Sequence, residues 1–192
     1  MRFGFTLVAC LLTGCATSGA AFEWKEGSDL ASAEGKYKNA DAVILLHQRH
    51  TKLVGVYQPG KFSQTDHVHN VILIRNEKAF DYGNVRIPYS NKGEVLYFDA
   101  RTVSPDGVVT PLEPERVFDE EVKAGETGSK TKVFALPKVT VGSRIEYRYA
   151  LKHPFIFWYR RTFFGDRIPV LRYEVTLEGT DDVKYIVRTA NT

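Results

Sequence analysis

From residue 42 onward, stretches of β-branched and aromatic residues alternate with turn residues at intervals of about ten residues. This pattern restricts the fold more than any other feature, because helical periodicity is scarce in the same region. Residues 144–152 and 171–177 alternate apolar with polar side chains, so each is predicted to be a strand with one wet and one dry face. The sequence therefore predicts a mainly β fold, an antiparallel β-sandwich-like single domain.

The turn residues divide this region into several predicted strands. In residues 67–75, Val71 and Leu73 point to one face and Ile72 and Ile74 to the other, so both faces of this strand are expected to be covered. The predicted strands cover residues 42–57, 67–75, 82–88, 95–103, 108–110, 144–152, 171–177 and 183–187.

Two segments between the strands have a distinct composition. Pro105-Asp106-Gly107 predicts a reversal of the chain, because Pro favours the second position of a turn and Gly tolerates positive φ. The segment between Leu112 and Lys132 is rich in Asp and Glu and is expected to form a mobile acidic loop. A calcium site there is not expected, since the D-x-D-x-D-G spacing is missing.

The first fifteen residues differ from the rest of the chain. A positive charge at Arg2 precedes a mostly apolar stretch over residues 3–12, and small residues then lead to Cys15, which resembles a bacterial lipoprotein signal. Such a signal implies cleavage before Cys15 and acylation of this cysteine, which would anchor the protein in the lipid bilayer. Ala16 resembles the sorting pattern of outer-membrane lipoproteins, so the protein is expected to face the periplasm. The alternative is an ordinary secretory signal cleaved within residues 16–21.

The expected organisation has three parts. Residues 1–14 form the signal peptide, residues 15–36 a flexible tether, and residues 37–192 the β domain. The tether contains several Gly and Ser residues with few large apolar ones. A flexible chain of this length would hold the domain roughly 25 Å from the membrane.

Composition and motifs argue against several classes of enzyme and ligand. Cys10 and Cys15 are the two cysteines of the chain, so the β domain has no thiol for nucleophilic, redox or zinc chemistry. The net charge of +3 is spread along the chain, and nucleic acid is therefore not an expected partner. His67 and His69 could share one face of a strand and bind zinc, but the favoured interpretation is a pair of solvent-facing histidines. No metal, cofactor or catalytic residue is predicted.

One segment has an unusual density of aromatic and arginine side chains. These residue types are enriched in the centres of protein interfaces, and aromatic faces also stack on sugars. The simpler alternative is a core strand with its connection. The candidate partner-binding residues are Phe157, Trp158, Tyr159, Arg160 and Arg161.

The β region resembles a known family, domain of unknown function 3857 (DUF3857), which precedes transglutaminase-like domains in bacterial envelope proteins. The resemblance depends on residues 41–46, 75–78, 85–89, 99–107, 132–137 with 141–147, and 168–171. It implies a β-rich fold that accompanies an enzyme domain using Cys, His and Asp. Because no cysteine follows Cys15, the enzymatic function is not expected to carry over.

The expected function is that of a noncatalytic, lipid-anchored envelope module that docks a protein or a glycan. An enzyme whose residues are scattered beyond motif detection is one alternative. The other is the N-terminal part of a transglutaminase-like or protease-like enzyme whose catalytic domain lies elsewhere.

Overall fold

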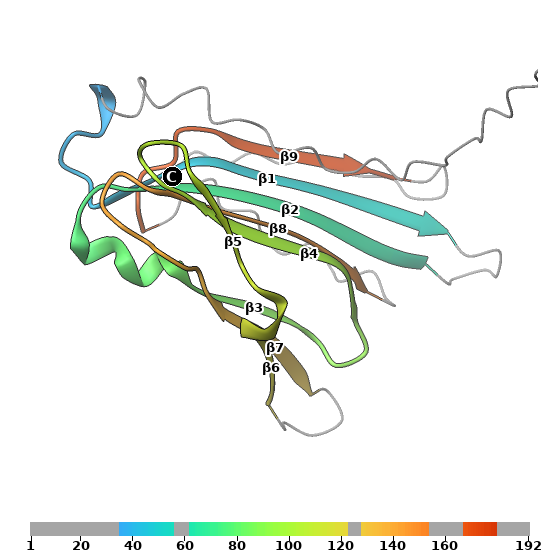
Figure 1. The fold of residues 1–192 in the computed structure, drawn as a ribbon. Coiled ribbons are helices and arrows are strands. Elements are labelled where there is room, and N and C mark those ends of the chain that lie inside the picture. The colour runs from blue at the N-terminus through green and yellow to red at the C-terminus, as the bar shows by residue number, and fades with distance from the viewer. Residues whose placement is uncertain (1–34, 56–61, 123–127, 154–166, 180–192) are drawn as a thin grey trace, which may run out of the picture.

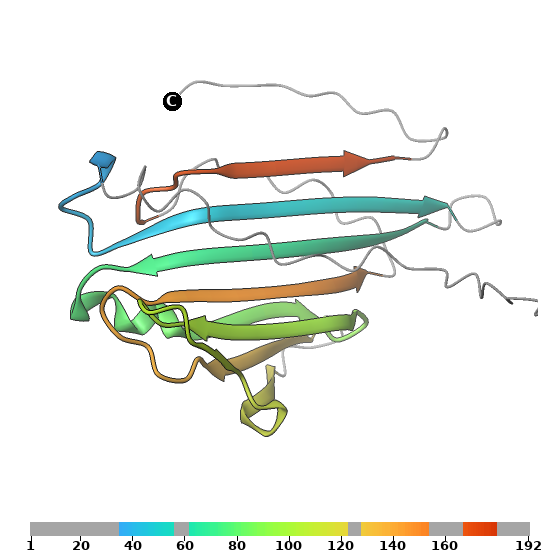
Figure 2. The same cartoon turned by 45° about the horizontal axis from the view of Figure 1, so that its top comes forward.

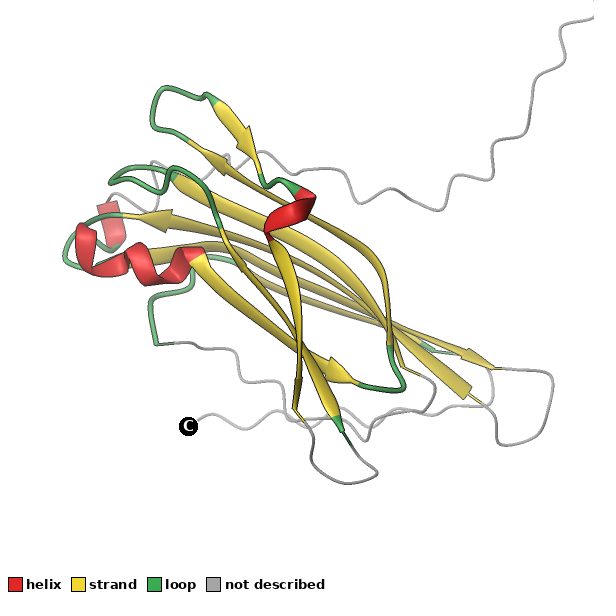
Figure 3. Ribbon diagram, turned by 60° about the horizontal axis from the view of Figure 1, so that its bottom comes forward, coloured by secondary structure: helices red, strands yellow, loops and turns green. Residues whose placement is uncertain are grey.

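The computed structural model describes residues 35–55, 62–122, 128–153 and 167–179 (Figure 1). The predicted signal, Cys15, most of the tether and the predicted strand over 183–187 lie outside these residues. The strands are β1 (Ala42–Gly55), β2 (Phe62–Ile74), β3 (Asn84–Ser90), β4 (Glu94–Val103), β5 (Val109–Pro111), β6 (Val117–Val122), β7 (Ser129–Ala135), β8 (Arg144–His153) and β9 (Tyr173–Glu178). Two 3-10 helices, η1 (Glu77–Gly83) and η2 (Pro114–Arg116), link strands, and Figure 3 shows how short they are.

The strands form two sheets, which confirms the predicted mainly β, sandwich-like single domain. The larger sheet has six strands in the order β5-β4-β8-β2-β1-β9, and Figure 2 shows the last five of them from bottom to top. The smaller sheet has the order β3-β7-β6. Neighbouring strands are antiparallel except β9, which runs parallel to β1.

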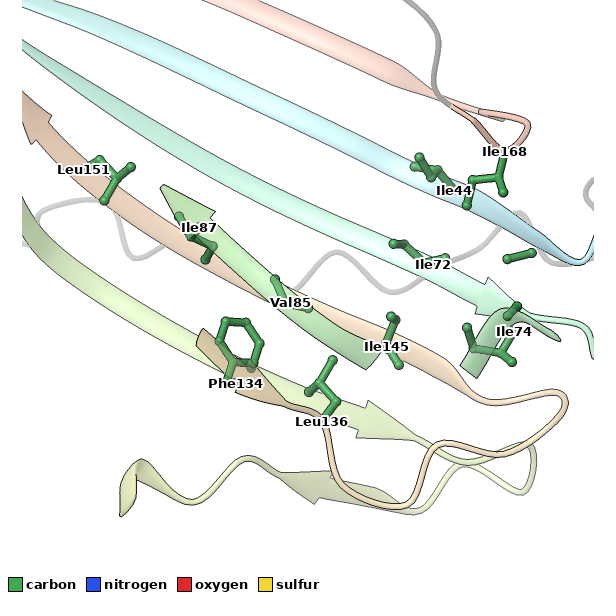
Figure 4. Close-up of a cluster of buried hydrophobic side chains, with 13 residues drawn as sticks. Ile44, Ile72, Ile74, Val85, Ile87, Phe134, Leu136, Ile145, Leu151 and Ile168 are labelled. Atoms are coloured by element: carbon green, nitrogen blue, oxygen red, sulfur yellow. The ribbon is translucent and has the colours of Figure 1, made fainter. Parts of the chain in front are cut away.

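The main hydrophobic core lies between the two sheets (Figure 4). Ile72 and Ile145 of the six-stranded sheet are 6% and 0% exposed, and Phe134 of the three-stranded sheet is 2% exposed. Phe98 packs edge-on against Phe134 with ring centroids 4.8 Å apart, a favoured arrangement of aromatic rings. We call the face of the six-stranded sheet that carries this core its inner face.

A second apolar cluster covers part of the opposite, outer face of the six-stranded sheet. It contains Val43, Leu45, Leu46, Val71 and Leu73, with Tyr37, Ala40 and Leu171 packed against it. The pairing of β1 with β2 shifts between Ile44 and Leu46, so Leu45 and Leu46 both join this cluster. Since Ile72 and Ile74 belong to the main core, the prediction that both faces of β2 are covered is confirmed.

The predicted mobile acidic loop is wrong for most of its length. Strands β6 and β7 occupy it, and their charges alternate in sign across the pair: Lys132 Nζ lies 2.9 Å from Asp119 Oδ1, and Lys130 Nζ lies 3.0 Å from Glu121 Oε1. Opposite charges on facing strands stabilise a pair, and the sequence shows the acids without showing their partners.

Several strand boundaries also differ from the prediction. Strand β2 begins at Phe62, before the predicted residue 67, and Tyr82 belongs to η1 instead of a strand. The predicted wet face of β8 is not wet, because Glu146 is 1% exposed. Conversely, Leu177 on the predicted dry face of β9 is 41% exposed.

One end of the sandwich collects several chain reversals, and we call it the proximal end because β1 begins there. Pairing brings Ala42 of β1 beside Ile74 of β2, and Arg144 of β8 beside Val103 of β4. The predicted turn after Val103 is confirmed, with Gly107 at φ 87° and its N–H donating to Ser104 O at 2.9 Å. In Figure 1 this end lies on the left, with η1 and the connection between β7 and β8.

Candidate functional site

The predicted partner-binding residues, Phe157 to Arg161, lie outside the described residues, between His153 and Arg167. His153 ends β8, and its Nε2 lies 3.5 Å from Asp66 Oδ2. Ile168 belongs to the main core, and Val170 forms a parallel bridge with Ile44. The described chain therefore leaves at one end of the six-stranded sheet and returns at the other.

The structure adds a candidate docking site that the sequence reasoning missed, on the face of the three-stranded sheet that points away from the core. Arg86, Val133 and Phe118 stand opposite one another on β3, β7 and β6 and form one cross-strand row. Phe118 is 62% exposed. An open hollow at this row is lined by Asn84, Arg86, Arg116, Phe118, Val133, Phe134 and Ala135.

The two arginines of this hollow are held by exposed carboxylates. Arg86 Nη2 donates to Glu120 Oε2, and Arg116 Nε donates to Glu113 Oε2 at 3.0 Å. Exposed pairs of this kind contribute about 0 to 1 kcal/mol, so the guanidinium groups can exchange partners at little cost. An apolar surface with two such arginines fits a ligand that carries both apolar and acidic groups.

A closed polar centre surrounds Asp66 on the inner face of the six-stranded sheet. Asp66, which is 6% exposed, accepts hydrogen bonds from Thr51 Oγ1 at 2.7 Å, Arg49 Nη2 at 2.8 Å and Gln64 Nε2 at 3.0 Å. Burial by itself would raise the pKa of this carboxyl, but the contacts with His153, Thr51, Arg49 and Gln64 outweigh it and hold the pKa well below its usual range.

Charged rows cross the outer face of the six-stranded sheet. Arg148 Nη2 donates to Asp99 Oδ2 at 2.9 Å, and Arg101 Nε donates to Glu146 Oε2 at 2.6 Å. Arg144 Nε lies 3.6 Å from the other oxygen of Glu146. The pairs Arg148–Asp99 and Arg101–Glu146 join β4 to β8 by opposite charges in directly facing positions, so their first effect is to hold the register of the two strands.

The histidines are distributed over both faces. His67 and His69 share one face of β2, as predicted, but His69 is 0% exposed, so the interpretation as a solvent-facing pair is wrong for His69. His50 stands directly opposite His67, with ring centroids 6.0 Å apart. Burial and the neighbouring His50 lower the pKa of His67. Among the described residues, no group of three or more His, Cys, Asp or Glu side chains is arranged to hold a metal ion.

Catalysis by a carboxylate or an imidazole needs a group that can reach a substrate and exchange a proton. Asp66 and Glu146 are almost fully buried and already accept from their neighbours, so neither meets this requirement as placed. The described groups thus form structural networks, and the hollow beside Phe118 is the better candidate for recognition.

Only part of this could have been found from the sequence. Extending the alternation of residues 67–75 back by one residue places Asp66 on the same face as Val68 and Ile72, which would have marked it as an inward acid. The row of Arg86, Val133 and Phe118 had no such signal, because it needs β3 to pair with β7, a strand that lies far away in the sequence.

The comparisons with known proteins agree with the fold. Residues 61–192 match the family described as "Domain of Unknown Function with solved-structure structure (DUF3857)". The chain belongs to this family. The match confirms the resemblance noted in the sequence, and this DUF3857 chain has no match among curated proteins.

The DUF3857 fold also occurs in a solved structure. The crystal structure of a protein described as a putative protease from Parabacteroides distasonis ATCC 8503 superposes with a TM-score of 0.51 at 14% sequence identity. The likeness covers 62% of this chain and 24% of that chain, so the present protein spans about a quarter of the other. At this identity the likeness shows the fold alone. No helix among the described residues is long and apolar enough to cross a membrane.

Proposed function

We propose that this protein is a noncatalytic, lipid-anchored module of the bacterial cell envelope that docks a protein or a glycan through its β domain. The observation that carries the anchoring is the sequence before Cys15, where one basic residue, a short apolar stretch and small residues precede the cysteine. Acylated Cys15 would hold the protein in the outer membrane, facing the periplasm.

Two observations support the docking role. The first is the composition of the segment from Phe157 to Arg161, whose residue types are those of interface centres. The second is the hollow beside Phe118, where an exposed aromatic ring lies in one row with Val133 and Arg86. In the described part of the fold, the buried carboxylates of Asp66 and Glu146 already accept hydrogen bonds from their neighbours, which favours a binding role over a catalytic one.

The second candidate function is the N-terminal part of a transglutaminase-like or protease-like enzyme whose catalytic domain lies elsewhere. The solved structure favours it, because there the same fold accounts for only 24% of a chain described as a putative protease. In that case the docking partner would be the catalytic domain itself.

The anchoring is tested by labelling cells with an alkyne analogue of palmitate. The protein should be labelled, and Cys15→Ser should lose the label and leave the membrane fraction, since it lacks the acylated thiol. Cys10→Ser serves as the matched control and should behave like the wild type. Equal labelling of the Cys15→Ser variant would contradict the proposal.

Docking is tested with a photoreactive amino acid in place of Phe118, and in a second variant in place of Trp158. The control replaces Leu96, which is 48% exposed on β4, away from the hollow. A crosslink to one defined protein, or to peptidoglycan, from position 118 or 158 and not from 96 is the expected result. Crosslinks that are the same at all three positions would argue against a specific docking surface.

A further inference from the structure

Exposed apolar side chains gather on two connections at the proximal end. Val108, in the turn before β5, and Val109, the first residue of β5, are 58% and 49% exposed, and Val141, before β8, is 47% exposed. The two connections touch, because a Cβ at Gly142 would lie only 3.0 Å from Pro105 Cγ. Loop tips are normally polar, so three exposed valines on and directly beside these two connections are a feature that folding alone does not require.

The chain also approaches the fold from outside at this end. The described chain starts at Gly35 and reaches Ala42, the first residue of β1, which pairs with Ile74 at the proximal end. Just before β1, Asp41 O accepts a hydrogen bond from Arg75 N at 2.9 Å. In Figures 1 and 2 residues 35–41, η1 and the two connections all lie at the left.

We propose that the proximal end of the sandwich docks on the phospholipid surface in which Cys15 is anchored, with Val108, Val109 and Val141 entering the interface. This proposal rests on the proposed acylation of Cys15. It assigns an orientation to the domain: β1 points away from the membrane, and the opposite end of the sandwich is presented to the periplasm.

The length of the chain before β1 favours this end over the other. Residues 16–34 separate Cys15 from Gly35, and a flexible chain of about that length has an end-to-end distance of roughly 25 Å. The 14 residues of β1 extend about 46 Å at 3.3 Å per residue. For the flexible tether that the sequence predicts, bringing the far end of β1 to the bilayer would require about twice that end-to-end distance, whereas the proximal end would need no extension.

Charge at this end is close to balanced, so we expect the contact to depend mainly on apolar burial. The exposed basic residues Lys36, Lys38, Lys78, Lys138 and Arg167 outnumber the exposed acids Asp41, Glu77, Asp81 and Asp106 by one. A surface that binds anionic lipid by charge carries a clear excess of Lys and Arg. We therefore expect docking to be insensitive to the fraction of anionic lipid.

The test uses the near absence of cysteine. Once the signal is cleaved and Cys15 is acylated, a single introduced cysteine is the only free thiol of the chain. Val108→Cys and Val141→Cys, each labelled with an environment-sensitive fluorophore, are reconstituted in vesicles of phosphatidylethanolamine and phosphatidylglycerol. The vesicles carry acyl-chain quenchers about 5 to 10 Å below the headgroups, the depth that interfacial side chains reach. Leu96→Cys is the matched control, since its 48% exposure equals that of Val141 within one percent.

Quenching and a blue shift of the labels at 108 and 141, without either at 96, would support the proposal. Replacing Val109 and Val141 by serine should then remove most of the quenching at 108. Equal quenching at all three positions, quenching at none, or quenching that requires phosphatidylglycerol would overturn it. Flotation of the vesicles distinguishes a failure of the anchoring from a failure of the docking. A protein that floats without quenching is anchored but not docked, whereas a protein that does not float refutes both proposals.

Discussion

Replacing Asp66 by alanine should destabilise this protein far more than removing an exposed carboxylate. Asp66 is 6% exposed and accepts from Thr51, Arg49 and Gln64 at distances of 2.7 to 3.0 Å. Alanine would leave these donors without their acceptor. The guanidinium of Arg49 would also lose its carboxylate on the inner face of the sheet.

The expected loss is about 3 kcal/mol in the free energy of unfolding. Breaking a buried ion pair costs about 3 to 5 kcal/mol, and the lower end applies because the side chain of Arg49 remains 32% exposed and can be rehydrated. Domains of this kind have about 5 to 15 kcal/mol in total, so the variant loses a large share of its stability. Asp66→Asn keeps the shape without the charge and should fall between alanine and the wild type.

Urea unfolding, followed by circular dichroism, measures this difference. The midpoint should fall while the slope of the free energy against urea stays the same. Glu113→Ala is the matched control, because it removes an exposed carboxylate paired with Arg116 and should change the stability by no more than about 0.5 kcal/mol. An Asp66→Ala variant as stable as Glu113→Ala would refute the reasoning.

The pH dependence has a defined sign. Since the pKa of Asp66 is lower in the folded protein than the 3.8 of a free aspartate, its contribution is complete above that value and is lost as the pH falls further. The wild type should therefore lose stability below about pH 4 more steeply than Asp66→Asn does. Curves of equal slope in this range would contradict the pKa shift.

Two further perturbations test the charged rows and the proximal turns. Glu146→Ala should lower the free energy of unfolding by about 3 kcal/mol, because Arg101 and Arg144 lose their common buried partner. Glu146→Gln should lower it by less. Thermal unfolding measures the difference, and equal melting temperatures for the two variants would contradict the prediction. Gly107→Ala should cost about 1 to 2 kcal/mol from its positive φ alone, since a Cβ there meets nothing within 4 Å. Gly142→Ala should lower the free energy of unfolding by more than Gly107→Ala does in the same assay, because its Cβ would also press on Pro105. A smaller loss for Gly142→Ala would show that the two connections do not pack tightly.

Much of the local structure was readable from the sequence because it depends on neighbours along the chain. The alternation of Val71, Ile72, Leu73 and Ile74 placed two residues in each hydrophobic cluster, and the structure bears this out. The reversal at Pro105-Asp106-Gly107 was equally local, since a turn depends on the φ preferences of its own residues. The family followed from short segments spread over the same strands.

The acidic stretch before Lys132 shows where local reasoning stops. Asp119 and Glu121 belong to a strand because Lys132 and Lys130 face them on β7, and those partners lie on the far side of a chain reversal. Glu146 is buried for the same reason. Its neutralising partner, Arg101, comes from β4, 45 residues earlier in the sequence.

The sequence by itself determined the mainly β fold class, the turn after Val103, the family and the candidate acylation site, since each depends on short contiguous segments. The tertiary structure alone decided which strands are neighbours: β8 lies between β2 and β4, and β7 between β3 and β6. Pairing of distant strands is set by the total burial of both sheets and not by any one segment. For that reason the exposed row at Phe118 and the valines of the proximal end became visible only in the folded chain.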